Sequence, residues 1–147
     1  MKISDVMNRQ PVCIHKNATF AQAAELISRN HVSELMVVDD DDRFLGVLSV
    51  GDLIRATLPG YDEICREGIL LSAAWKLFLE NGEELSTAPI NRIVITKPIA
   101  YKSTDELVKV AATMICRQIH MLPVVDGGIL VGTISRGNLC NAVLAVH

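Results

Sequence analysis

In the stretch GVLSVGDL, from Gly46 to Leu53, an apolar run is followed by a hydroxyl residue, Ser49, and three residues later by a carboxylate, Asp52. A second phrase, GTISRGNL from Gly132 to Leu139, has the same layout. The two differ at the acidic position, where Asn138 replaces Asp52. A chain that writes one phrase twice is expected to contain two copies of one structural unit.

The likeness between the copies extends beyond these phrases. Aligning them also sets VSELMVVD (Val32 to Asp39) against IHMLPVVD (Ile119 to Asp126), with one extra residue in the turn that follows. Both copies carry signals for the order β-α-β-β-α, which predicts an α/β (α+β) fold. We expect the first copy at 1–58, a helical insert at 59–88 and the second copy at 89–147.

Local patterns define the expected elements. Thr19 and Gln22 have the spacing of a capping box before an amphipathic helix, and Ser103 and Glu106 have it in the second copy. Pro-Val-Cys-Ile at 11–14 and Pro-Ile-Ala-Tyr at 98–101 are expected to be short first strands. The remaining predictions are strands at 34–39, 43–49, 121–126 and 129–135, and helices at 19–30, 50–58, 103–118 and 136–146.

The insert contains a helical pattern. Leu71, Trp75 and Phe78 are spaced to share one helix face, and Asn81-Gly82 is a stop signal. Two interpretations stay open. The helix covers the protein's own core, or Trp75 and Phe78 form the centre of a dimer contact.

Composition excludes several functions. Half of the 147 residues are hydrophobic and the formal net charge is −3, which argues against nucleic acid as a partner. No apolar run is long enough for a membrane span, and the N-terminus lacks the apolar segment of a signal peptide. The four cysteines lack metal-ligand spacing and indicate reduced thiols, so a cytoplasmic location is expected.

Catalytic and metal sites are not expected. The acidic run Asp39–Asp42 lacks the spaced pattern of a calcium loop and predicts a solvated hairpin turn. No nucleophile and base stand in a recognisable arrangement, so an enzyme is the least favoured class.

The chain resembles a tandem pair of cystathionine-β-synthase-type (CBS) domains. The likeness rests on ISDVM at Ile3–Met7, LPVVD at Leu122–Asp126 and the paired GVLSVGDL and GTISRGNL phrases. It implies two repeats packed about a pseudo-two-fold axis, with clefts that hold AMP, ADP, ATP or S-adenosylmethionine. It also implies a disk-shaped homodimer, a regulatory role without catalysis, and an effector protein that receives the signal.

The first phrase has chemistry suited to a nucleotide. Gly46 would let a ligand approach the strand closely, and the Ser49 hydroxyl at the strand-to-helix junction can donate to a phosphate. The two carboxylate oxygens of Asp52 suit the hydroxyls of a ribose. The alternative is that Ser49 and Asp52 only cap a helix.

The second phrase predicts a different preference between the ribose and the phosphate of a ligand. Gly132 and Ser135 repeat the first pattern, but Asn138 offers a single acceptor oxygen without charge. Arg136 replaces an apolar residue, and a guanidinium at a helix N-terminus suits a phosphate. We therefore expect the first cleft to hold ribose better and the second to hold phosphate better. The alternative for Arg136 is an exposed, solvated charge.

Further contacts are expected around the base. Candidates for apolar contact with adenine are Val12, Ile14, Ile99 and Tyr101, although each is also typical of ordinary core. The family pattern places Thr19 near a cleft, and His120 is a candidate for a phosphate contact. Two functions remain in competition: a sensor of adenosine-containing nucleotides, and a dimerisation scaffold with empty clefts.

Overall fold

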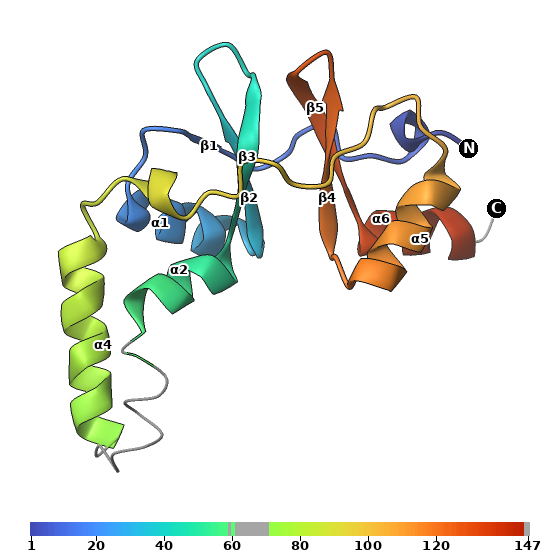
Figure 1. Ribbon diagram of the computed structural model, residues 1–147. Coiled ribbons are helices and arrows are strands. Elements are labelled where there is room, and N and C mark those ends of the chain that lie inside the picture. Colours follow the sequence, from blue (N-terminus) through green and yellow to red (C-terminus); the bar gives the residue numbers. More distant parts are fainter. Residues whose placement is uncertain (59, 61–70, 146–147) are drawn as a thin grey trace.

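The computed structural model describes residues 1–58, 60 and 71–145. Two units of mixed α and β structure lie side by side, with their β-hairpins upright at the centre (Figure 1). The helices of each unit lie on its outer side, away from the other hairpin (Figure 1). The hairpins therefore face each other, and each sheet has one face toward its own helices and one face toward the other unit.

The first unit contains a three-stranded sheet. In the order β1-β2-β3, β1 is parallel to β2 and β3 is antiparallel to it. Leu35, Val37 and Leu48 pack with the helices in one buried cluster. Alternation along the strand explains why these positions share a face. The elements are β1 (Cys13–His15), α1 (Phe20–Asn30), β2 (Glu34–Val38), β3 (Phe44–Ser49) and α2 (Val50–Thr57).

The second unit has one strand fewer than expected. Its elements are α5 (Leu107–Arg117), β4 (Met121–Asp126), β5 (Ile129–Ser135) and α6 (Arg136–Leu144), and β4 pairs with β5 in a two-stranded sheet. The strand predicted at 98–101 is wrong, because only Tyr101 forms a bridge, to Val124. Pro98 has no N–H to offer a ladder, which favours this short pairing.

The two predicted capping boxes had different outcomes. The Thr19 box is confirmed: Gln22 N–H donates to Thr19 Oγ1 and Thr19 N–H donates to the Gln22 side chain. The Ser103 box is wrong, since α5 begins at Leu107 after an N-cap residue, Glu106, that makes no side-chain cap. Ser103 instead donates from its N–H and its hydroxyl to Asp126.

The segments at the start of the two repeats are exchanged, since each packs into the core of the other unit. Near the N-terminus, η1 (Ile3–Asp5) places Ile3 in the core of the second unit, and η2 (Ile90–Arg92) places Ile90 in the core of the first. Backbone bonds secure both: Ile3 N–H donates to Asp105 O, and Ile90 N–H donates to Ala18 O. Each core is thus completed by residues that lead into the other repeat.

A contact between the hairpin tips marks the pseudo-two-fold axis. Phe44 N–H donates to Gly128 O (2.9 Å) and Leu130 N–H donates to Asp42 O (3.2 Å). The bridge between them joins Arg43 and Ile129, which are equivalent positions of the two repeats. Equivalent residues meet in this reciprocal way only across a two-fold axis, so the expected symmetry is confirmed.

Residues 59 and 61–70 of the predicted insert lie outside the described part of the chain. Its described part contains α4 (Leu71–Leu85), which extends along one side of the first unit (Figure 1). Phe78 and Leu85 line a groove with residues of α1 and α2, so the helix covers part of the protein's own core. Trp75 stacks on Phe78 with ring centroids 5.6 Å apart and is 60% exposed. The inner face of α4 is therefore a packing surface, while the outer face keeps Trp75 in solvent.

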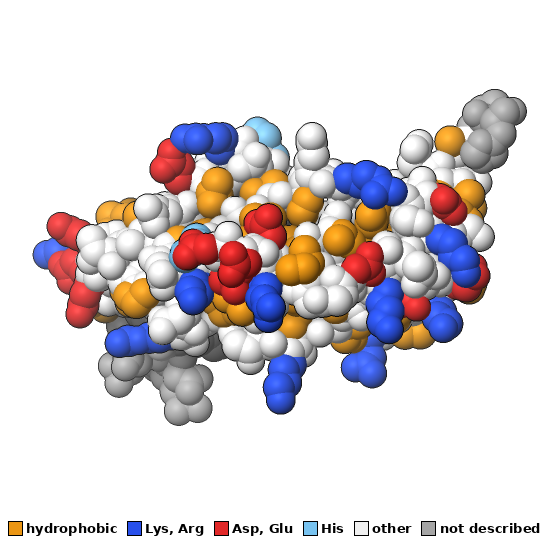
Figure 2. Space-filling model, turned by 90° about the horizontal axis from the view of Figure 1, so that it is seen from above, with side chains coloured by type: hydrophobic (Ala, Val, Ile, Leu, Met, Phe, Trp, Pro, Cys, Tyr) orange, Lys and Arg blue, Asp and Glu red, His pale blue; other side chains and the backbone are white. Residues whose placement is uncertain are grey.

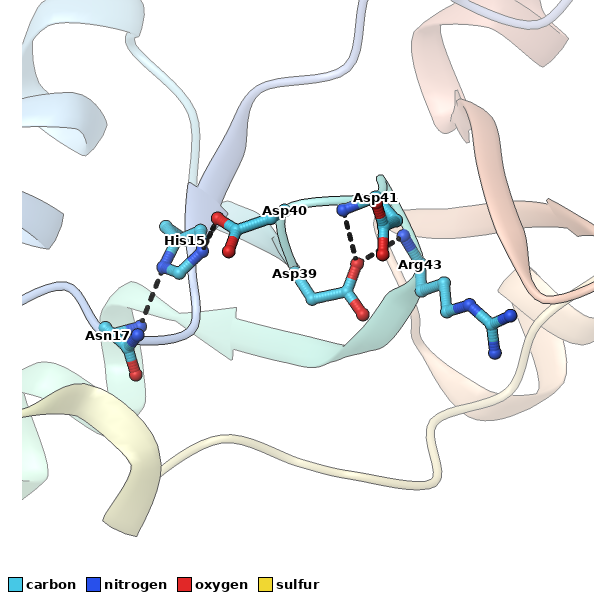
Figure 3. A network of polar contacts seen from close by, with 6 residues as sticks. All are labelled: His15, Asn17, Asp39, Asp40, Asp41 and Arg43. Atoms are coloured by element: carbon cyan, nitrogen blue, oxygen red, sulfur yellow. Dashed lines mark hydrogen bonds and ion pairs between the residues drawn. The ribbon is translucent and has the colours of Figure 1, made fainter.

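The acidic run forms a turn in which the Asp39 side chain binds backbone N–H groups (Figure 3). Asp39 Oδ1 accepts hydrogen bonds from the N–H groups of Asp41 (2.9 Å) and Arg43 (3.0 Å). Beside the turn, His15 Nδ1 accepts from Asn17 N–H (3.2 Å), and His15 Nε2 lies 2.6 Å from Asp40 Oδ1. The predicted hairpin turn is confirmed.

Charges of both signs are mixed over the face that carries the hairpin tips (Figure 2). Among the described residues, no group of three His, Cys, Asp or Glu side chains is arranged to hold a metal ion. Over the same residues, no helix combines the length and the hydropathy needed to cross a bilayer.

Candidate functional site

The face between the two units positions the candidate residues. Met36, Val38 and Val47 alternate with the core residues of β2 and β3, and all three are buried. Since they point away from α1 and α2, the second unit is what covers them. Ser49 continues this face at the end of β3, where the chain turns into α2.

Site 1 is defined here as Ser49 and Asp52 at the start of α2. Ser49 Oγ donates to Asp52 Oδ2 (2.8 Å) and accepts from Asp52 N–H (3.1 Å), so the pair caps the helix. Arg55 donates to Asp52 Oδ1 at 2.5 Å. Burial alone would raise the pKa of Asp52, but the hydrogen bonds from Arg55 and Ser49 outweigh it and lower the pKa. The carboxylate is therefore ionised at neutral pH.

Site 2 is defined as Ser135 and Asn138 at the start of α6. Asn138 Oδ1 accepts from Ser135 N–H (2.9 Å) and Ser135 Oγ (2.8 Å), while Asn138 N–H donates to Ser135 Oγ (3.1 Å). The same local geometry thus recurs at both sites. Site 2 differs in having a neutral amide where site 1 has a carboxylate.

Arg136 has a structural role that the sequence did not reveal. Its Nε donates to Ile119 O (3.0 Å) and its guanidinium also donates to Met114 O (3.1 Å). Met114 lies in the last turn of α5 and Ile119 lies just beyond its end, so the guanidinium binds the C-terminal end of this helix. Two donors expected for a phosphate are thus committed to the backbone, and Arg136 is not a solvated surface charge.

The two glycines of the repeated phrases accommodate the chain itself. A Cβ at Gly46 would lie 2.3 Å from Ile95 O, and one at Gly132 would lie 2.5 Å from Asn8 O. Ile95 and Asn8 belong to the exchanged segments, and they bridge Val47 and Thr133 respectively. The expected close approach is real, but a neighbouring backbone makes it instead of a ligand.

The residues expected around adenine are dispersed. Ile14 is 3% exposed and belongs to the first core, so it offers almost no surface to a ligand. Ile99 and Tyr101 line a hollow of about 360 Å³ beside α5, together with Thr113 and Arg117. Tyr101 hydrogen-bonds Thr113 within it. This hollow is separate from both sites.

The other predicted contacts have backbone roles. Val12 is half-buried beside β2, where its carbonyl accepts from Met36 N–H (3.1 Å). Thr19 is occupied in capping α1. His120 is exposed and adjoins site 2, because its carbonyl accepts from Arg136 N–H (3.1 Å).

Sequence reasoning missed one charged residue beside site 1. Glu34, at the start of β2, pairs in register with Ser49, so the two side chains lie on the same face of the sheet. Its equivalent in the second unit is Met121, which pairs with Ser135. The alignment of VSELMVVD with IHMLPVVD contained this signal, since Glu34 is the only charged residue of the first stretch before its terminal Asp39.

Comparison with known proteins resolves the family. The family model described as "CBS domain" matches residues 3–58 and again residues 90–145. The chain belongs to the CBS domain family. The matched ranges correspond to the two repeats, so the resemblance first inferred from the paired phrases is confirmed.

Similar proteins span the whole CBS pair. The uncharacterized protein MJ1426 of Methanocaldococcus jannaschii is 23% identical, over 98% of this chain and 92% of its own length. The crystal structure of CBSX2 in complex with AMP superposes with a TM-score of 0.72 and 23% identity, covering 97% of this chain and 96% of that one. The CBS domain pair of MJ0100, in complex with 5′-methylthioadenosine and S-adenosyl-L-methionine, gives a TM-score of 0.69 and 19% identity, covering 97% and 95%. These likenesses confirm the fold.

Proposed function

We propose that this CBS pair is a regulatory module that binds an adenosine derivative at sites 1 and 2 and passes the signal to a partner protein. The observation that carries the proposal is the hydroxyl–carboxylate pair of site 1, placed at a helix N-terminus on the face between the repeats. The similar pairs in CBSX2 and MJ0100 hold AMP, 5′-methylthioadenosine or S-adenosyl-L-methionine.

The geometry of site 1 leaves capacity for a ribose. Asp52 uses one oxygen for Ser49 and the other for Arg55, and each carboxylate oxygen has a second acceptor position. Arg55 is an exposed side chain that can turn into solvent when a diol replaces it. The free N–H groups of the first helical turn favour an electron-rich group at the Ser49 end of the ligand.

Signal transmission is proposed to run through the packing of the two repeats. Site 1 lies on the face where the repeats meet, so a ligand that contacts both would favour one arrangement over others. The output would then be read by a separate protein. Catalysis is not part of the proposal, and the cytoplasm is its proposed location because the thiols of Cys116 and Cys140 are exposed and free.

Calorimetry and thermal melting test this function. We expect one or more of AMP, ADP, ATP, S-adenosylmethionine and 5′-methylthioadenosine to bind, and a ligand at a hundred times its Kd to add about 2.7 kcal/mol of stability. Asp52→Ala should lower the affinity of site 1 for its ligand by about tenfold. Asp41→Ala, which removes an exposed carboxylate from the hairpin turn, is the matched control. A chain that binds none of these compounds would refute the proposal.

A groove in the second unit favours association of two copies as a further candidate role. It has a volume of about 500 Å³ and runs between α5 and α6, where Val108 is 73% and Val143 is 71% exposed. In the first unit the equivalent groove, between α1 and α2, has α4 as an additional wall. α4 carries Glu80, Glu83 and Glu84 against Lys76, whereas α5 carries Lys109 and Arg117, and the carboxylate that lines the groove, Glu106, is paired with Lys2.

We therefore propose a homodimer in which the exposed face of α4 lies against the α5–α6 groove of a second copy. Sedimentation of the full chain tests it. Val108→Glu should shift the chain from dimer to monomer, while Glu25→Ala on the exposed face of α1 should not. A monomer at every concentration would exclude both the homodimer and the alternative of a dimerisation scaffold.

A further inference from the structure

Glu34 stands where the 5′ end of a ligand at site 1 would lie. It pairs in register with Ser49, and facing residues of an antiparallel pair have Cβ atoms about 4.5–5.5 Å apart. With a ribose at Asp52, one helical turn along, the group next to Ser49 is the 5′ substituent. The carboxylate of Glu34 and the 5′ substituent therefore compete for one region.

The Glu34 side chain is half-buried at the start of β2. Its neighbours on the same face of β2 are Met36 and Val38, which are 0% and 7% exposed. Burial raises the pKa of Glu34. Within the described residues no hydrogen bond or ion pair reaches its side chain, whereas Asp52 has Arg55 as a counter-ion. Glu34 thus places beside site 1 an acidic group that has no counter-ion among the described residues.

Site 2 supplies an internal comparison. Met121 takes the place of Glu34, and Asn138 takes the place of Asp52. The nearby charge is the guanidinium of Arg136, which lies at the start of α6. The same backbone frame is therefore negative in the first repeat and positive in the second.

We propose that Glu34 makes site 1 selective for adenosine derivatives with an uncharged or cationic 5′ substituent, and that phosphorylated nucleotides are directed to site 2. The inference rests on the proposed function and adds a ligand class to each site. A phosphate next to Ser49 would face a half-buried carboxylate, and like charges at such a site repel more strongly than in bulk water. A 5′-thioether is uncharged and is not repelled, and a 5′-sulfonium is cationic and is attracted to the carboxylate.

The test uses 5′-methylthioadenosine and AMP, which share a nucleoside and differ at the 5′ position. In the full-length Asn138→Ala variant, which weakens site 2, calorimetry should show the thioether binding at least about tenfold tighter than AMP. Adding Glu34→Met, which introduces the residue found at site 2, should raise the affinity for AMP by about tenfold. The preference for the thioether over AMP should therefore decrease. Glu25→Met, which removes a remote exposed carboxylate, should leave the preference unchanged.

Two complementary variants keep the inference falsifiable if Asn138→Ala is unstable. Asp52→Ala should retain AMP binding and lose most binding of the thioether, and Met121→Glu should weaken AMP. Equal affinities in Asn138→Ala, or an unchanged preference in Glu34→Met, would overturn the selectivity and leave the proposed function standing. No binding of either compound to the unmodified chain would overturn both.

Discussion

Replacing Gly46 by alanine tests whether the exchanged segment is essential to the fold. The new Cβ would lie 2.3 Å from Ile95 O and 2.7 Å from Val94 Cγ1, and the first of these is backbone that cannot rotate away. The segment must move outward, which breaks the reciprocal bonds between Val47 and Ile95 (3.0 and 2.9 Å).

The expected cost follows from these contacts. Two backbone hydrogen bonds contribute about 0.5–1.5 kcal/mol each, and displacement of a packed segment costs about 1–3 kcal/mol. Breaking the hydrogen bonds and displacing the segment are partly the same event, so the two costs do not add in full. We therefore expect Gly46→Ala to lower the free energy of unfolding by about 2–4 kcal/mol. For a chain of this size the melting temperature should fall by roughly 5–15 °C.

The assay is thermal and urea unfolding followed by circular dichroism, with Gly82→Ala as the control. Gly82 lies in α4 with nothing within 4 Å of an added Cβ, so alanine there should stabilise by about 0.5–1 kcal/mol. Gly132→Ala should resemble Gly46→Ala, since Asn8 O lies 2.5 Å from its Cβ. A Gly46→Ala protein as stable as Gly82→Ala would show that the segment does not pack as described.

Two further predictions concern single side chains. The raised pKa of Glu34 means that the folded state holds its proton to higher pH than the unfolded state, so this residue lowers stability as pH rises through that window. Glu34→Gln should therefore melt higher than the unmodified chain at pH 7, with the difference vanishing near pH 4; an equal difference at both values would contradict this. Thr19→Ala removes the capping box of α1 and should cost about 1 kcal/mol in urea unfolding, and no loss would mean that Gln22 or water replaces the cap.

The sequence predicted those elements whose signals are local. The runs that form β2, β3, β4 and β5 alternate or are continuously apolar between turn residues, and all four strands are present. The helix after Thr19 was found because its cap and its apolar face lie within one stretch. Ser103 offered the same spacing, but Asp126, distant in sequence, binds it instead.

Contacts between distant segments explain what the sequence did not predict at the site. The glycines at 46 and 132 indicated a close approach correctly, yet only the fold shows that the exchanged segments make it. Arg136 has the chemistry of a phosphate ligand, but only the fold shows that its guanidinium donates to the carbonyls of Met114 and Ile119 at the end of α5. Glu34 was overlooked because its partner, Ser49, is identified by strand register.

The reciprocal exchange of leading segments also bears on biosynthesis. The ribosome delivers the whole first repeat before residues 88–95 emerge, so its apolar interior stays open to water, or to a chaperone, during that interval. The N-terminal residues in turn must wait for the last repeat before they find their own place. Maturation of the two halves is consequently a joint event that requires both repeats, and a nascent chain stalled between them should be a preferred target for proteolysis.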